Sequence, residues 1–243
     1  MPRVAAVHAG RDSMTILQEA ETLNLPRAEF SSSADKKKLL AKPPIDSKRL
    51  LDIFGASLCL MLCAPVMLII VICLSFTGSP VFSQRRVGRG GELFVCYKFR
   101  SMVKDADRVL AEYLQRNPQA KEEWSRVHKL TDDPRVTLVG RFLRKSSLDE
   151  LPQLFNVLRG DMSLVGPRPI VPAEVPRYAS RIRAYNRCRP GITGLWQVSG
   201  RNLTSYRRRV ALDAVYARKC SVRLDLFILF KTIRVVTVGR GAW

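Results

Sequence analysis

The feature that most restricts how this chain can fold is an uncharged apolar run from Ile53 to Phe76. Its length of about 24 residues meets the requirement of roughly 20 apolar residues for a helix inserted in a bilayer. The run starts too far from the first residue to be a cleaved secretory signal, and no small-residue cleavage pattern follows it. We therefore expect a permanent membrane segment.

The charges around this run and a proline within it indicate how it lies in the bilayer. Cations stand on both sides, so both ends satisfy the positive-inside rule for the same face of the membrane. They are Lys36, Lys37, Lys38, Lys42, Lys48 and Arg49 before the run, and Arg85, Arg86 and Arg89 after it. Pro65 near the middle removes one helical hydrogen bond and clashes with the preceding turn. The pattern favours a re-entrant hairpin broken at Pro65, and it leaves open a kinked single-pass helix, because membrane helices tolerate proline.

Length, charge and cysteine usage limit the rest of the chain. A sequence of 243 residues, 47% of them hydrophobic, has room for one ordinary domain with extensions. Its 41 Lys and Arg against 21 Asp and Glu give a net charge of +20, which favours anionic lipid, phosphorylated substrates or nucleic acid as partners. The six cysteines form no disulfide framework and no CxxC zinc spacing, so a reducing compartment is expected.

Composition divides the chain into three parts. Residues 1–47 are rich in Ser, Lys and Pro, which is typical of a flexible basic tail near anionic lipid, with a short helix expected at Met14–Leu23. Residues 48–80 contain the membrane segment, and residues 81–243 have the patterns of a small folded domain. We expect that domain to contain the chemistry.

Periodicity predicts a mostly helical domain with one β-hairpin about Arg89-Gly90-Gly91. The predicted helices lie at 106–130 with an interruption at Asn117-Pro118, at 148–158 with Gly160 as C-cap, and at 206–218. Near the C-terminus, the segment LDLFILFKTIRVV fits a helix lying in the membrane interface. A buried core helix explains that segment nearly as well.

Asp149 and Glu150 are the strongest candidates for chemistry. They follow a group of cations that includes Arg144, and they open the predicted helix. A carboxylate there meets unpaired N–H groups and the positive end of the helix dipole, which keep it ionised and also attract phosphate. Asp149 could attack phosphorus or hold Mg2+, while the arginine neutralises phosphate charge. The structural alternative is a capping box between Ser147 and Glu150, which has the full S-x-x-E pattern and which Pro152, so early in the helix, weakens only a little.

Three further candidates lie in stiff or glycine-rich segments. Arg168 stands between two prolines, so its backbone would lose little entropy when the side chain grips an anion. Arg201 follows Ser199-Gly200, where backbone N–H groups could form an anion nest, although a turn with a solvated arginine is the simpler interpretation. Trp196 could stack on a nucleobase, and a buried tryptophan is equally compatible with the sequence.

Three long motifs resemble a single known family. They are KFRSM at Lys98–Met102, RKSSLDELPQLFNVLRGDMSLVGPRP at Arg144–Pro169, and RPGITGLWQVSGRN at Arg189–Asn202. From about Lys48 to Trp243 the chain resembles the bacterial sugar transferases, the monotopic polyprenyl-phosphate phosphoglycosyl transferases. The resemblance implies a membrane-associated, mostly helical α/β fold. In it a re-entrant helix-break-helix hairpin, broken at Pro65, joins a small cytosolic catalytic domain with interfacial amphipathic helices.

The resemblance also implies a reaction. Asp149 and Glu150 match the family's acidic pair, so Asp149 would attack the sugar-bearing phosphorus of a UDP-sugar, expel UMP and form an aspartyl phospho-sugar. Mg2+, with Asp149 as a ligand, would steady the pyrophosphate. Undecaprenyl phosphate would then accept the sugar phosphate, which begins an exopolysaccharide or surface glycan. Arg144, Arg168 and Arg201 match positions that would bind phosphate or nucleotide.

The same resemblance sets expectations about donor and location. The motif GLWQVSGR is more similar to that of family members that transfer hexose-1-phosphate, so galactose or glucose is the expected sugar. The chain resembles the short form of the family, at the cytoplasmic face of the bacterial inner membrane, with anionic lipid but no nucleic acid as partner, and it is compatible with a homo-oligomer. Ala64 stands where relatives commonly have Ser before the proline, so a serine hydroxyl cannot stabilise the break here.

Two alternatives to this reaction stay open. A non-catalytic, membrane-tethered module that binds nucleic acid or anionic lipid would use the +20 charge, but it leaves the acidic pair and the glycine-rich loops without a role. A two-substrate transferase without a covalent intermediate uses the same residues, and the sequence does not separate it from the covalent route.

Overall fold

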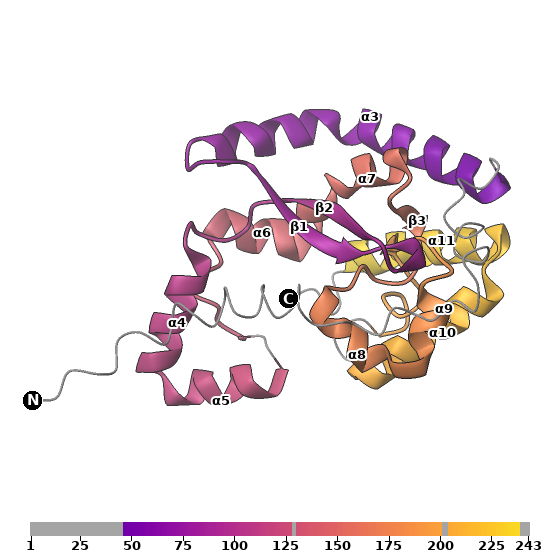
Figure 1. Ribbon diagram of the computed structural model, residues 1–243. Helices are drawn as coiled ribbons and strands as arrows, with labels where there is room; N and C mark the ends of the chain where they lie inside the picture. Colours follow the sequence, from indigo (N-terminus) through magenta and orange to yellow (C-terminus); the bar gives the residue numbers. More distant parts are fainter. Residues whose placement is uncertain (1–45, 128–129, 201–203, 239–243) are drawn as a thin grey trace, which may run out of the picture. The chain divides into compact units, whose positions relative to one another are not determined.

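The structure, a computed structural model, describes residues 46–127, 130–200 and 204–238 of the 243-residue chain. These residues form two compact units, one of residues 101–142 and one of residues 46–100 with 143–238. The predicted helix at Met14–Leu23 lies outside the described residues. Figure 1 shows the elements in chain order.

One long helix, α3, contains the apolar run. It begins at Ser47, after the cap residue Asp46, and ends at Ser75. Its backbone stays helical through Pro65, so no interruption of the helix marks the predicted break. Figure 1 shows a bowed helix, which is how a helix accommodates a proline that removes one hydrogen bond without ending it. The re-entrant course in a bilayer stays a prediction.

Most of α3 is not covered by the rest of the protein. Among the described residues it is the one helix long and apolar enough to cross a membrane, and only 11% of its most apolar stretch is buried. Phe54, Met61 and Phe76 are 71%, 67% and 85% exposed. So large an apolar surface is uncommon on a soluble protein, and it is consistent with membrane association.

The first turn of α3 is fixed to the C-terminal helix by a buried ion pair. The Lys48 ammonium lies 2.6 Å from the carboxylate of Asp225, which is fully buried in α11 (Val222–Val238). The same ammonium donates to the carbonyl oxygen of Val165 at 3.0 Å, and the Tyr216 hydroxyl donates to Asp225 at 2.6 Å. Lys48 therefore acts inside the fold rather than as a free flanking cation.

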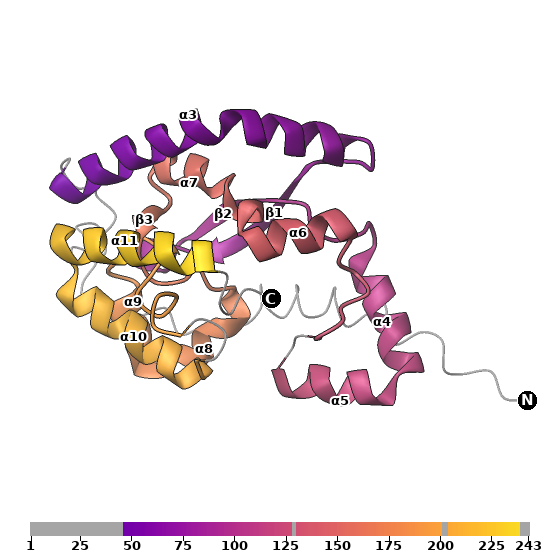
Figure 2. The same ribbon diagram turned by 180° about the vertical axis from the view of Figure 1, so that it is seen from behind.

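Two further charged residues of α3 bind the middle of the larger unit. The Arg49 guanidinium donates to the carbonyl oxygens of Val157 and Leu158, at 2.6 and 2.8 Å, in the last turn of α7 (Gln153–Arg159). Asp52, only 1% exposed, accepts hydrogen bonds from the Ser163 hydroxyl and the Leu164 N–H, both at 2.9 Å. Figure 2 shows α3 lying along α7 from the opposite side. The first turns of α3 are thus anchored in this unit, although most of the helix is exposed.

The predicted hairpin is confirmed. Strand β1 (Val81–Val87) pairs antiparallel with β2 (Leu93–Phe99) across a 3-10 turn at Arg89–Gly91. Gly90 and Gly91 have φ values of 72° and 81°, which side-chain-bearing residues rarely adopt. On β2, Cys96 is buried and Lys98 extends from the same face two residues later.

The remaining elements largely follow the predictions. The interruption at Asn117-Pro118 separates two helices, and α7 ends at Gly160 in the left-handed conformation, with φ 92°. The short strands β3 and β4 are parallel. They lie so close that a Cβ on Gly191, the first residue of β4, would collide with the backbone of Gly166, which follows β3. The bounds are α4 Ala106–Arg116, α5 Pro118–Val127, α6 Leu138–Ser146, β3 Ser163–Val165, α8 Val175–Tyr178, α9 Ile182–Tyr185, β4 Gly191–Thr193 and α10 Tyr206–Lys219.

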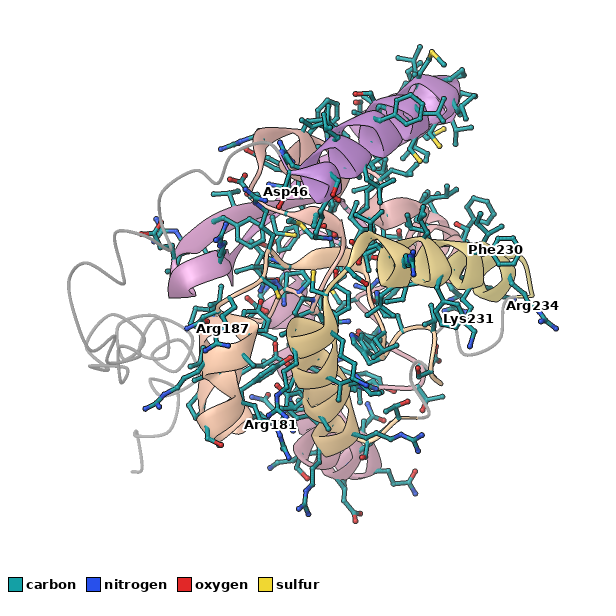
Figure 3. The ribbon with its side chains drawn as sticks, turned by 90° about the vertical axis from the view of Figure 1, so that its right-hand side faces the viewer. Asp46, Arg181, Arg187, Phe230, Lys231 and Arg234 are labelled. Atoms are coloured by element: carbon teal, nitrogen blue, oxygen red, sulfur yellow. The ribbon has the colours of Figure 1, made fainter. Side chains whose placement is uncertain are left out.

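Helix α11 has one buried side, as expected of a core helix, and one exposed apolar side, while its position in a membrane interface stays a prediction. Asp225 and Ile228 are fully buried, whereas Phe227, Phe230 and Ile233 are 50%, 75% and 65% exposed. Figure 3 shows Phe230 and Lys231 projecting from different sides of the helix. One side therefore belongs to the core, and the other presents apolar side chains outward.

The side chain of Asn156 joins α7 to the hairpin. This residue is fully buried, and its amide nitrogen donates to the carbonyl oxygen of Val95 at 2.7 Å. Its amide oxygen accepts the N–H of Tyr97 at 3.1 Å. One side chain thus satisfies two backbone groups of β2 and sets where that strand lies against α7.

We expect Asn156→Leu to lower the free energy of unfolding by about 2–4 kcal/mol, because two buried backbone groups of β2 lose their partners. Thermal unfolding of the purified protein in detergent measures the effect. Gln115→Leu on the exposed side of α4 is the control and should change stability by less than about 0.5 kcal/mol. Equal stability of the two variants would contradict the linking role of Asn156.

Candidate active site

Asp149 and Glu150 lie in a 3-10 turn, Leu148–Glu150, ahead of α7. The predicted helix start is therefore wrong by several residues, and the pair does not occupy a helix N-terminus. The physical reason is Pro152, whose missing N–H is harmless directly before the first helical residue but costs a hydrogen bond further inside. Ser147 is left-handed, with φ 60°, and its side chain makes no cap bond, so the capping-box alternative is also wrong.

Lys98 stands between the two carboxylates. Its ammonium lies 2.7 Å from Oε1 of Glu150 and 3.7 Å from Oδ2 of Asp149. Asp149 is only 8% exposed, while Glu150 and Lys98 are partly buried. No local pattern in the sequence gives Lys98 a role of its own, although its alternation with Cys96 on β2 places it on the same face of the strand as that buried residue.

The two acids differ in how readily they ionise. Burial raises the pKa of Asp149, with Lys98 opposing that rise and the charge of Glu150 adding to it. Burial also disfavours ionised Glu150, but Lys98, Arg168 and Arg86 together hold the pKa of Glu150 below its usual value. Glu150 is therefore the stable anion that holds Lys98, and Asp149 is the poorly solvated carboxylate beside it.

Arg144 and Arg168, both predicted site residues, are brought to this pair. Arg144 in the last turn of α6 lowers the pKa of Asp149 through its charge, and Arg168 does the same for Glu150. Arg86 was counted only as a membrane flank, yet its guanidinium donates to the carbonyl oxygen of Pro169 at 3.1 Å. Arg201 lies outside the described residues.

Trp196 is a buried core residue rather than a stacking surface for a nucleobase. It is only 3% exposed, so it offers no open face for stacking. Two guanidinium groups lie over its ring, with Arg168 at 5.8 Å and Arg209 at 4.7 Å from the ring centre. Arg209, in α10, carried no motif signal because its partners are far away in sequence.

The donors fit a magnesium ion only if a substrate completes its coordination. Among the described residues no group of three or more His, Cys, Asp or Glu side chains could hold a metal ion. Mg2+ commonly uses one or two carboxylates together with substrate phosphate oxygens. Asp149 and Glu150 supply that number of carboxylates, next to arginines suited to phosphate.

A mostly exposed apolar helix, together with a buried acid near a lysine and arginines, is consistent with a membrane-associated enzyme that acts on phosphate groups. The chain belongs to the bacterial sugar transferase family, whose sequence profile matches residues 45–239.

Named relatives support this assignment. The chain is 50% identical over 199 residues to the exopolysaccharide production protein ExoY of Sinorhizobium fredii, covering 81% of this chain and 88% of the relative. It is 50% identical over 197 residues to the undecaprenyl-phosphate galactose phosphotransferase of Salmonella typhimurium, covering 81% and 41%. It is 39% identical over 208 residues to the UDP-glucose:undecaprenyl-phosphate glucose-1-phosphate transferase of Klebsiella pneumoniae, covering 81% and 41%. The chain thus spans less than half the length of the last two relatives.

We expect Lys98→Met to destabilise the protein by about 1 kcal/mol at neutral pH, because Glu150 loses its ion pair. The folded-state pKa of Glu150 lies below its unfolded value, so this stabilisation is present above the unfolded pKa and is lost as the pH falls through the folded pKa. Melting temperatures between pH 8 and pH 3 should therefore converge with the wild type at the acid end.

Lys104→Met, at an exposed position, serves as the control and should track the wild type throughout. A loss of stability in Lys98→Met that is equally large at all pH values would show that Lys98 acts by packing rather than by charge.

Proposed function

We propose that this protein transfers a sugar-1-phosphate, of galactose or glucose, from a UDP-sugar to undecaprenyl phosphate and releases UMP. This would be the first step in building an exopolysaccharide or surface glycan. One observation carries the proposal: the poorly solvated Asp149 carboxylate stands beside the Glu150–Lys98 ion pair, within the field of two arginines. Relatives named for galactose- and glucose-phosphate transfer to undecaprenyl phosphate support the choice of substrates.

In the proposed reaction, Asp149 acts as the nucleophile. One of its carboxylate oxygens bonds to the sugar-bearing phosphorus of the donor, while the bond from that phosphorus to the UMP oxygen breaks. An oxygen of undecaprenyl phosphate then bonds to the same phosphorus, and the bond to Asp149 breaks, which restores the carboxylate. The raised pKa of Asp149 fits this role, because burial leaves its charge weakly solvated and ready to be shared with phosphorus.

The neighbouring cations would neutralise the phosphates. Arg144 and Arg168 can bind phosphate oxygens through their planar guanidinium groups, and Arg201 remains a predicted third ligand. Glu150 holds Lys98 close to Asp149, so the lysine can face the transferred phosphate without moving. Mg2+, held by Asp149 and the donor, would withdraw charge from the pyrophosphate when bound.

The lipid acceptor lies in a membrane, so the protein must bind that membrane. The exposed apolar side chains would make this contact. Exposed residues of α3 would enter the bilayer as the predicted re-entrant segment, at the cytoplasmic face of the inner membrane. Phe230 of α11 would lie at the interface, where an amphipathic helix keeps its polar side in water. The rival binding module uses the basic charge alone and gives no reason for a buried Asp149 carboxylate beside the Glu150–Lys98 ion pair.

UMP release by the protein in detergent tests the reaction. We expect release with UDP-galactose or UDP-glucose in the presence of undecaprenyl phosphate and Mg2+, and a loss of about a thousandfold or more in Asp149→Asn. Asp132→Asn, a highly exposed acid, is the matched control and should keep wild-type turnover. Absence of release with every hexose donor from folded protein would favour the binding module.

The covalent step has its own measurement. Incubation with donor labelled in the sugar, without lipid acceptor, should leave label on wild-type protein and none on Asp149→Asn. Label that never stays on the protein, while UMP release still needs the acceptor, would instead support direct transfer between the two substrates.

A further inference from the structure

One face of the β-hairpin extends from the acidic pair toward the end of the apolar helix. Side chains alternate between the two faces of a strand, and paired residues of antiparallel strands share a face. Phe82 pairs with Lys98, and Gln84 pairs with Cys96. Phe82 and Gln84 therefore lie on the face that carries the lysine of the site, although neither has a role in the reaction as described.

The polar part of this face is bound to the segment that carries Arg168. The Arg86 guanidinium donates to Oε1 of Gln84 at 2.6 Å and to the carbonyl oxygen of Pro169 at 3.1 Å. Phe82 comes four residues before Arg86 on the same face, which is about 13 Å along the strand. This face of β1 therefore changes from an aromatic ring to a guanidinium group.

The open end of the hairpin is bound to the last turn of α3. Arg100, directly after β2, donates to the carbonyl oxygen of Leu74 at 3.1 Å and to the Thr77 hydroxyl at 2.6 Å. Buried Phe99 packs in the same cluster as Leu74. Figure 1 shows β1 continuing from the end of α3. Phe82, the second residue of β1, therefore lies close to the end of the apolar helix as well as to the site.

The position of Phe82 gives its exposed ring a specific neighbour. The side chain is 50% exposed, and its cross-strand partner is Lys98. The ammonium of that lysine lies 2.7 Å from Glu150 and 3.7 Å from Asp149. Directly opposite residues of an antiparallel pair have Cβ atoms about 4.5–5.5 Å apart. A ligand whose phosphate meets Lys98 and Asp149 would therefore bring its next atoms within reach of the Phe82 ring.

We infer that Phe82 is a binding residue for the lipid acceptor: its ring packs against the isoprene units next to the phosphate of undecaprenyl phosphate, while that phosphate meets Lys98 and Asp149. The inference rests on the proposed transfer for the identity of the acceptor. Such a molecule has an anionic head and an apolar chain, and this face offers a cation and an aromatic ring side by side. The rest of the lipid chain continues toward the end of α3, where Phe76 is 85% exposed.

Phe82→Ser tests the inference, with Val81→Ser as the matched control. Val81 is 40% exposed and adjoins Phe82, but it lies on the opposite face of the hairpin. We expect Phe82→Ser to raise KM for undecaprenyl phosphate about tenfold and to change KM for the UDP-sugar less than about twofold, because an apolar contact with the acceptor alone is lost. Val81→Ser should change neither constant by more than about twofold, and Phe82→Leu, which keeps an apolar side chain, should stay within about threefold of the wild type.

Three results would overturn the inference. An unchanged KM for the acceptor in Phe82→Ser would show that the ring does not contact the lipid. Equal rises in Phe82→Ser and Val81→Ser would show that exposed apolar side chains at this end of the hairpin serve attachment to the membrane in general. A rise in KM for the UDP-sugar rather than for the acceptor would show that the ring stacks on the donor sugar.

Lipid binding without donor separates this inference from the proposed reaction. No transfer takes place without a UDP-sugar, and undecaprenyl phosphate should then raise the melting temperature of the wild type and of Val81→Ser in detergent. Phe82→Ser should need about tenfold more lipid for the same rise. Equal rises in the three proteins, or none in any of them, would overturn the inference. Lipid binding that depends on Phe82, without UMP release from any donor, would contradict the proposed function and support the lipid site.

Discussion

The arrangement of the site depends on the buried amide of Asn156. By satisfying two backbone groups of β2, it fixes that strand against α7. Lys98 follows Tyr97 in β2, and Asp149 and Glu150 lie in the turn that leads into α7. Asn156 touches none of these three residues, yet it helps to set the distance between the lysine and the two acids. A site built from a strand and a turn requires such a link, because neither element places the other.

The charged first turns of α3 fix this apolar helix to α7 and α11. Arg49 donates to the carbonyl groups of Val157 and Leu158 at the end of α7, and Lys48 pairs with buried Asp225. Beyond these turns α3 is mostly exposed and apolar, apart from Ile70 and Leu74, which pack with Phe99 and Leu143. The helix is thus joined to the framework of the site both near its first turns and near its last turns.

Electrostatics give the three acids of this region different tasks. Glu150 is held ionised by Lys98 and the surrounding arginines, although it is partly buried. Asp149 is disfavoured as an anion by burial, which suits a group that must share its charge with phosphorus. Asp213 lies deeper, where burial raises its pKa to about 7 and the Tyr178 hydroxyl donates to it. Part of the excess positive charge in the sequence is therefore gathered around the acidic pair, where it offsets the cost of burying the two carboxylates.

The sequence by itself determined what depends on neighbours along the chain. Two helices separate at Asn117-Pro118 because proline restricts its own helix and the residue before it, and Gly160 ends α7 because glycine readily adopts positive φ. Asp149 and Glu150 stand in a long local motif, as do Arg144 and Arg168, so they could be named as candidates without a structure.

Only the tertiary structure decided which distant groups meet. Glu150 and Lys98 are 52 positions apart, and Asp213 and Tyr178 are 35 apart, so no local pattern pairs them. Local rules also gave no partner to Lys48, which pairs with the buried carboxylate of Asp225 rather than standing as a free flanking charge. The charge of each side chain and the local backbone preferences follow from the sequence. The distances between charged groups and their burial, which set the properties of the site, depend on tertiary packing.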